Sequence, residues 1–208
     1  MTLVFKKEAV KQFLKWGQRV FFACAVLLLG YCAFALVDAW TFQRRENLDL
    51  DRMLRDRGAA SLSTPVAAAN GLIGRMEIPR LGLSAIVVEG TGRTALRRGV
   101  GHIPGTALPG EAGNVGLSGH RDTFFRPLKD LRTKDEIRFS TLKGDFRYEV
   151  ESLRVVEPSD VSVLVPSHEN VLTLVTCYPC FYIGAAPKRF VVRARQVSPE
   201  TMARSVVK

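Results

Sequence analysis

Hydrophobic positions follow two different patterns along this chain, one near the N-terminus and one through most of the remaining sequence. From Val20 to Val37 no charged residue interrupts the apolar run. At 1.5 Å per residue, a helix of this length approaches the roughly 30 Å thickness of the hydrocarbon core of a bilayer. The pattern therefore predicts a transmembrane helix over residues 20–37.

A cleaved signal peptide is the alternative interpretation of this run. Its apolar region would be shorter and would end in a small-residue cleavage site, whereas Asp38-Ala39-Trp40-Thr41 follows here. Lys and Arg are more frequent in the fifteen residues before the run than after it, which favours a cytoplasmic N-terminus. We expect an uncleaved signal anchor with residues 1–19 as a cytoplasmic tail.

Residues 38–70 have a composition of their own. Residues 41–57 are highly charged and carry Leu50, Met53 and Leu54 at helical spacing, which predicts a juxtamembrane helix. Residues 58–70 are rich in small residues, which predicts a flexible linker that holds the following domain away from the bilayer.

From residue 71 to residue 197 the pattern changes to short β-branched and aromatic runs bounded by Gly, Pro, Asn or Asp. Lys143-Gly144-Asp145 separates two alternating runs and predicts a hairpin turn. Residues 94–98 and 159–164 are candidates for short helices. Many short strands with few helices favour a mainly β fold, a closed or nearly closed β-barrel, over residues 71–197. Residues 198–208 are expected to be a loose tail.

The formal net charge of +10 raises nucleic acid as a possible partner. Five of the basic residues precede the apolar run, and the others are interleaved with acidic residues along the chain. This distribution is typical of a solvated basic surface, so no nucleic-acid partner is expected.

Two of the four cysteines, Cys24 and Cys32, lie inside the apolar run, which leaves Cys177 and Cys180 for chemistry. Cys177 ends the run VLTLVTC, immediately before Tyr178-Pro179, so a strand is expected to end there and present a thiol at its rim. A nucleophile requires this combination of rigid support and solvent access. The alternative is a cysteine packed as a small hydrophobic residue.

His120 follows another predicted strand end, Ser118-Gly119, where Gly119 would let the backbone turn. A histidine near a thiol can take its proton and later return one to a leaving amine, as in covalent acyl transfer. Two other histidines compete for this role. His102 lies in a loop rich in Gly and Pro and is a candidate to line the cleft, whereas His168 is expected in an exposed turn.

Arg189 stands twelve residues after Cys177, at the start of the next predicted strand. A connection of this length can fold back and bring Arg189 beside Cys177 across a strand pair. A guanidinium there can donate to the oxyanion of a tetrahedral acyl intermediate. The alternative is an ordinary arginine exposed at a strand end.

Taken together, TLVTC, an arginine on the next strand and SGHRDTFF far upstream resemble the sortases, closely matching the class D and related Gram-negative-type members. The resemblance covers about residues 71–197. It implies an eight-stranded sortase β-barrel as the catalytic domain, with Cys177 as nucleophile, His120 as the essential histidine and Arg189 as the arginine of the site.

The resemblance also implies a reaction. A sortase recognises a C-terminal sorting signal of the LPxTG kind on a surface or secreted protein, cuts after its threonine and forms a thioacyl enzyme. An amine of the cell envelope resolves this intermediate, whereas water would give hydrolysis. The implied enzyme is a single-pass protein of the cytoplasmic membrane with its N-terminus inside and its catalytic domain outside. It needs the bilayer as a partner and neither a cofactor nor a metal.

Cys180 departs from the family pattern, in which this position is usually aromatic, and it creates a CxxC with Cys177. A disulfide that traps the nucleophile, or a resolving thiol, is one hypothesis. A small packed substitute is the other.

Three other functions stay open. A thiol-disulfide oxidoreductase would want a helix directly after Cys177, where Pro179 stands instead. A zinc site would need further ligands at suitable spacing. A non-catalytic barrel that binds envelope peptides would keep the fold. Residues 107–113 and 157–170 are the expected walls of a substrate groove.

Overall fold

The computed structural model describes residues 7–56 and 71–197. The chain divides into two units, Met1–Thr41 and Phe42–Lys208. The long helix α1 (Lys7–Asp56) runs through the boundary between them. The two units are described separately below.

The first unit is the N-terminal part of α1. Its apolar side chains are exposed on all faces, among them Phe21, Leu27, Leu29, Phe34 and Leu36. By length and composition the helix is able to cross a membrane. A helix that is apolar all round is suited to a lipid environment. This unit therefore fits a single-pass membrane anchor, as the sequence predicts.

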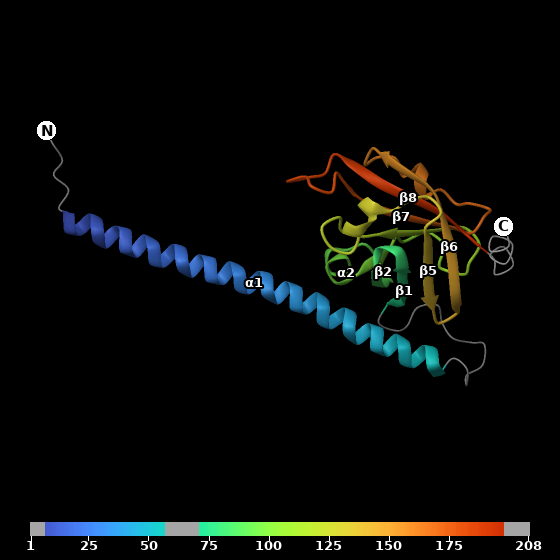
Figure 1. The fold of residues 1–208 in the computed structure, drawn as a ribbon, viewed down its shortest axis with the longest axis horizontal. Coiled ribbons are helices and arrows are strands. Elements are labelled where there is room, and N and C mark those ends of the chain that lie inside the picture. The colour runs from blue at the N-terminus through green and yellow to red at the C-terminus, as the bar shows by residue number, and fades with distance from the viewer. Residues whose placement is uncertain (1–6, 57–70, 198–208) are drawn as a thin grey trace. The chain divides into compact units, whose positions relative to one another are not determined.

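The described part of the second unit contains eight strands that close into a barrel in the order β1-β2-β3-β4-β7-β8-β6-β5 (Figure 1). The predicted closed β-barrel is confirmed. The strands are β1 (Leu72–Ile78), β2 (Leu83–Glu89), β3 (Val100–His102), β4 (Asn114–Ser118), β5 (Glu136–Thr141), β6 (Gly144–Val156), β7 (Val171–Tyr178) and β8 (Lys188–Gln196).

Short helices connect the strands. The predicted helical segments correspond to α2 (Arg93–Arg98), which lies beside β2 in Figure 1, and to the 3-10 helix η3 (Val161–Leu164). Two further 3-10 helices are η1 (Pro79–Leu81) and η2 (Arg126–Asp130).

Alternation along each strand separates an interior from an exterior face. In β7, Leu172 and Leu174 belong to the barrel core, and therefore Thr173, Val175 and Cys177 face outward. The same alternation turns Gly116 and Ser118 of β4 outward, since Val115 and Leu117 are core residues. The candidate nucleophile thus lies on the outer face of the barrel.

The predicted hairpin is present between β5 and β6, but its turn lies at Leu142-Lys143, earlier than the predicted Lys143-Gly144-Asp145. β6 already begins at Gly144, and Gly144 pairs with Thr141 of β5. The Thr141 hydroxyl accepts hydrogen bonds from the backbone N–H groups of Lys143 and Gly144, at 3.1 and 3.2 Å. These hydrogen bonds to the Thr141 side chain close the turn before Gly144.

Residues Phe42–Asp56 of α1 pack against the barrel. Leu50 is fully buried in a small apolar cluster with Leu72 of β1 and Ile86 of β2. The Gln43 side chain accepts a hydrogen bond from the Ile86 backbone N–H at 2.9 Å and donates to a carbonyl oxygen of α2 at 2.7 Å. The helical prediction for residues 41–57 agrees with α1, but its packing on β1 and β2 was not foreseen. In the barrel order these strands lie across from β7 and β8.

One ion pair links η1 to the loop before β5. The Arg80 guanidinium donates to both carboxylate oxygens of Asp135, at 2.5 and 2.6 Å, and the Arg132 backbone N–H donates to the same carboxylate at 2.7 Å. Chiefly because of the hydrogen bond from Arg80, the pKa of Asp135 lies below its ordinary value.

The lowered pKa of Asp135 predicts how the free energy of unfolding depends on pH. A carboxyl whose pKa is lower in the folded than in the unfolded state stabilises the fold above its unfolded pKa, near 3.9, and loses this contribution as the pH falls through the folded value.

Asp135→Asn is therefore expected to lower the free energy of unfolding at pH 7 and to make that free energy decline less steeply below pH 4. Urea titrations followed by near-ultraviolet circular dichroism measure both. Asp130→Asn, at a mostly exposed carboxylate nearby, is the control.

Candidate active site

Three neighbouring strands bring the predicted site residues together. β4 and β7 are parallel with Ser118 opposite Val175, and β8 runs antiparallel to β7 with Arg189 opposite Cys177. His120 lies two residues after Ser118, just as Cys177 lies two residues after Val175. The sequence-predicted histidine, cysteine and arginine therefore meet at one end of three adjacent strands.

Two hydrogen bonds extend the pairing of β4 and β7 beyond the end of β4. The Gly119 N–H donates to the Val175 carbonyl oxygen at 3.3 Å, and the Thr176 hydroxyl donates to the Gly119 carbonyl oxygen at 2.8 Å. Both bonds join the residue before His120 to the residues just before Cys177. They fix the position of His120 along the strand direction relative to Cys177.

The chain turns immediately after His120, whose carbonyl oxygen accepts from the N–H groups of Thr123 and Phe125 at 3.3 and 3.1 Å. Gly119 is required here for space and not for an unusual backbone angle. A Cβ at this position would lie 2.7 Å from the ring of Phe125, which is fully buried. Close packing against Phe125, and not the backbone turn expected from the sequence, therefore explains the glycine at position 119.

Accessibility differs among the three residues. His120 is exposed, and Cys177 and Arg189 are partly buried. The Arg189 Nη1 atom donates to the carbonyl oxygens of Ala186 and Lys188, at 3.2 and 3.0 Å. Within the described part of the chain, the other two guanidinium nitrogens donate to no protein group. These two nitrogens therefore remain available to bind a ligand at the Cys177 thiol.

Arg121 is a feature of the site that the sequence analysis missed. Its side chain is only 9% exposed. Nη1 donates to the Pro179 carbonyl oxygen at 3.1 Å, and Nη2 donates to those of Tyr182 and Gly184 at 2.6 and 3.1 Å. Arg121 therefore ties the residue after His120 to the loop that joins Cys177 to Arg189. Its position beside His120 in SGHRD was the one sequence signal available.

A second buried residue, Asn114, fixes the segment between β6 and β7. Its amide donates to the carbonyl oxygens of Val163 and Val165, at 3.1 and 3.3 Å, and its oxygen accepts from the Thr173 hydroxyl at 2.7 Å. These bonds hold η3 over the outer face of β4 and β7. Gly116 lies beneath this cover, since a Cβ there would lie 3.1 Å from the Leu164 side chain.

The two competing histidines lie outside this cluster. His102 is buried, with Nδ1 2.9 Å from the Glu89 carboxylate and Nε2 3.0 Å from both the Ala107 carbonyl oxygen and the Thr106 hydroxyl. The expectation that His102 might line a cleft is wrong, because both ring nitrogens are engaged within the fold. His168 is exposed, as expected.

Cys180 lines a cavity of about 370 Å³ together with Tyr178 and Phe190, and Cys177 is not among the residues that line it. The rings of Tyr178 and Phe190 stack across β7 and β8, on the opposite side of these strands from Cys177 and Arg189. Cys177 and Cys180 are both free thiols. The redox switch stays a hypothesis.

Residues 7–56 and 71–197 hold no group of three or more His, Cys, Asp and Glu side chains suited to a metal ion. The chemistry available at this strand end is that of a thiol, an imidazole and a guanidinium. Such a set suits acyl transfer through a covalent thioester.

Comparison with known proteins decides the family. The model of the sortase domain matches residues 76–197. The chain belongs to the sortase family. Its sequence is 37% identical to sortase D of Bacillus subtilis over 192 residues, which cover 85% of this chain and 95% of the relative.

Two other relatives support the assignment. Sortase SrtE1 of Streptomyces coelicolor is 32% identical over 185 residues, 78% of this chain and 52% of that longer protein. Among solved structures, a sortase D5 transpeptidase of Clostridium perfringens superposes with a TM-score of 0.61 at 25% identity, covering 78% of this chain and 99% of that one. The resemblance drawn from the sequence motifs is thereby confirmed, and this sortase is a member of a family of cysteine transpeptidases.

Proposed function

We propose that this sortase is a membrane-anchored transpeptidase that cleaves an LPxTG-like C-terminal sorting signal and joins the released protein to an amine of the cell envelope. The observation that carries the proposal is the convergence of His120, Cys177 and Arg189 at one end of β4, β7 and β8. Three chemically complementary groups at one strand end suit acyl transfer better than a binding barrel, which would need none of them.

In the proposed first step, the Cys177 thiolate attacks the carbonyl carbon of the scissile peptide bond. Negative charge develops on the carbonyl oxygen, and Arg189 donates hydrogen bonds to it. Protonated His120 gives its proton to the leaving amine as the C–N bond breaks, so a thioester and a free amine result. In the second step an acceptor amine attacks the thioester and yields a proton to His120. The Cys177 thiolate leaves, and water in place of the amine would give hydrolysis.

We also propose the membrane arrangement. Residues 20–37 span the cytoplasmic membrane once, residues 1–19 lie in the cytoplasm, and residues 71–197 act on the extracytoplasmic side. The apolar surface of α1 and the family membership support an anchor of this kind. The proposed linker, residues 58–70, and the proposed tail, residues 198–208, lie outside the described residues.

The test of the function uses the full chain in detergent with reductant, internally quenched peptides that contain LPxTG-like signals, and an amine such as triglycine. We expect cleavage, a ligated product and a thioacyl adduct visible by intact mass. Cys177→Ala is expected to abolish all three.

Cys180→Ser is the matched control and is expected to keep the adduct, because Cys180 lines a cavity that Cys177 does not line. An adduct that persists in Cys177→Ala, or that disappears in Cys180→Ser alone, would contradict the assignment of the nucleophile. A wild type that binds peptides without cleaving any of them would favour a binding barrel.

A further inference from the structure

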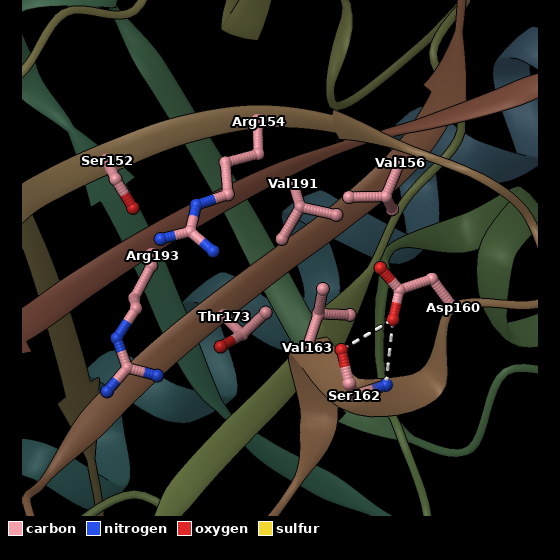
Figure 2. A pocket seen from close by; sticks show the side chains of 9 residues that line it. All are labelled: Ser152, Arg154, Val156, Asp160, Ser162, Val163, Thr173, Val191 and Arg193. Atoms are coloured by element: carbon pink, nitrogen blue, oxygen red, sulfur yellow. Dashed lines mark hydrogen bonds between the residues drawn. The ribbon is translucent and has the colours of Figure 1, made fainter.

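A pocket of about 140 Å³ opens on the outside of the barrel, beside the strands that carry Cys177 and Arg189 (Figure 2). Its lining comes from β6, β8, β7 and the segment that contains η3. The lining includes Arg154, Val156, Asp160, Ser162, Val191 and Arg193.

The strand register places this pocket on the same face as the candidate active site. Val156 of β6 pairs with Arg189, which pairs in turn with Cys177. The next outward-facing row along the strands contains Arg154 and Val191. Directly paired residues share one face of a sheet, and every second residue returns to that face. The pocket is therefore a continuation of the surface on which the thiol lies.

Distance along the strand follows from the same register. Val191 lies two residues and Arg193 four residues beyond Arg189 on β8. At about 3.4 Å per residue, these rows lie roughly 7 and 14 Å from the Cys177–Arg189 pair. An extended peptide has nearly the same rise, so side chains about two to four residues from the cleaved bond would reach the pocket.

The charges of the pocket favour an anion. Arg154 takes part in no hydrogen bond or ion pair with the described residues. Arg193 lies 3.7 Å from Glu151, whose other carboxylate oxygen lies closer to Arg195, at 2.9 Å. Two guanidinium groups thus line one pocket, and only that of Arg193 is paired with a carboxylate, which it shares with Arg195.

One oxygen of the pocket's acidic residue is engaged within the fold. Asp160 is the N-cap of η3, and its Oδ1 atom accepts from the backbone N–H and the hydroxyl of Ser162. Figure 2 shows this pair on the right, while the guanidinium groups of Arg154 and Arg193 lie on the left. The pocket thus holds one carboxylate against two guanidinium groups. Val191 lies between the two sides and Val156 lies above Asp160 in the picture, and both offer apolar surface for an aliphatic stem.

We propose that this pocket is a subsite for an acidic side chain of the substrate peptide, carried two to four residues from the cleaved bond. Guanidinium groups bind carboxylates through charge-assisted hydrogen bonds, and the valines accommodate the methylene groups of a glutamate. The variable position of an LPxTG-like signal falls within this range. The inference rests on the proposed function and names one feature of its substrate.

The test measures kcat/KM of the full chain in detergent with pairs of quenched LPxTG-like peptides. The two members of a pair differ by Glu against Gln at one position, placed two, three or four residues before or after the cleaved bond. We expect wild type to prefer Glu about tenfold at one of these positions, the size expected for a hydrogen bond to a charged group. Higher salt is expected to reduce that preference.

Arg154→Met and Arg193→Met are each expected to bring the ratio of the two kcat/KM values, Glu peptide over Gln peptide, close to one. Arg132→Met, at an exposed arginine away from the pocket, is the control and is expected to keep the preference. Equal cleavage of Glu and Gln peptides at every position, or a preference that survives both substitutions, would overturn the subsite. Failure to cleave any peptide would instead overturn the proposed function.

Discussion

Replacing His120 with glutamine is expected to lower kcat roughly a thousandfold, within the range typical of a lost general acid, while KM changes little. Glutamine keeps much of the size and polarity of the imidazole but cannot give a proton to the leaving amine. The His120 backbone belongs to the turn fixed by Thr123 and Phe125, so the substitution leaves that frame in place. Steady-state kinetics with a quenched peptide separate kcat from KM.

His168→Gln is the matched control, because His168 is also exposed but lies in the segment between β6 and β7. It is expected to retain near wild-type turnover. An equal loss in both variants, or a loss confined to KM in His120→Gln, would remove His120 from the proton-transfer role.

The second large effect is expected for Arg121→Met, which we predict will lower kcat/KM roughly a hundredfold. Arg121 is a positioning residue, since its guanidinium donates to three carbonyl oxygens of the loop between Cys177 and Arg189. Methionine keeps an apolar stem but leaves these oxygens without their donor. Small displacements of reacting groups can cost about this much in rate.

Hydrogen exchange distinguishes positioning from a general loss of structure. Amides in the loop from residue 179 to residue 187 are expected to exchange faster in Arg121→Met, whereas those of β1, β2 and β5 keep their wild-type rates. Arg126→Met, at an exposed arginine of η2, is expected to change neither rate nor exchange. Wild-type kcat/KM in a folded Arg121→Met protein would show that the loop needs no such restraint.

Arg121 illustrates a limit of reading single residues. An arginine in a polar stretch is usually a solvated surface residue, and nothing in its neighbours signals burial. The contacts that bury it come from the loop between β7 and β8, about sixty residues later in the chain. Only the pairing of β4 with β7 brings these segments together.

His102 illustrates the opposite error. A histidine in a loop rich in Gly and Pro was a reasonable candidate for a cleft, yet it ends β3 and is enclosed by Glu89, Thr106 and Ala107. The hydrogen-bond partners of its ring come from β2 and from the chain after β3. Local composition carries no information about such partners.

The packing of Leu50 was also beyond local inference. The helical spacing of Leu50 and Leu54 indicates an amphipathic helix but not the surface that it covers. The cluster with Leu72 and Ile86 exists because β1 and β2 turn these side chains outward.

The sequence by itself determined the apolar span and the succession of short strands and supplied the candidate site residues, because each depends on local periodicity or on a residue type at a strand end. Cys177 and Arg189 could be paired in advance, since one short connection joins consecutive antiparallel strands. Tertiary structure alone decided that Arg121 bonds to the loop between β7 and β8 and that Arg154 and Arg193 share a pocket on the face of Cys177. These relations depend on barrel closure and strand register, which the long-range packing of the whole domain selects and no single segment encodes.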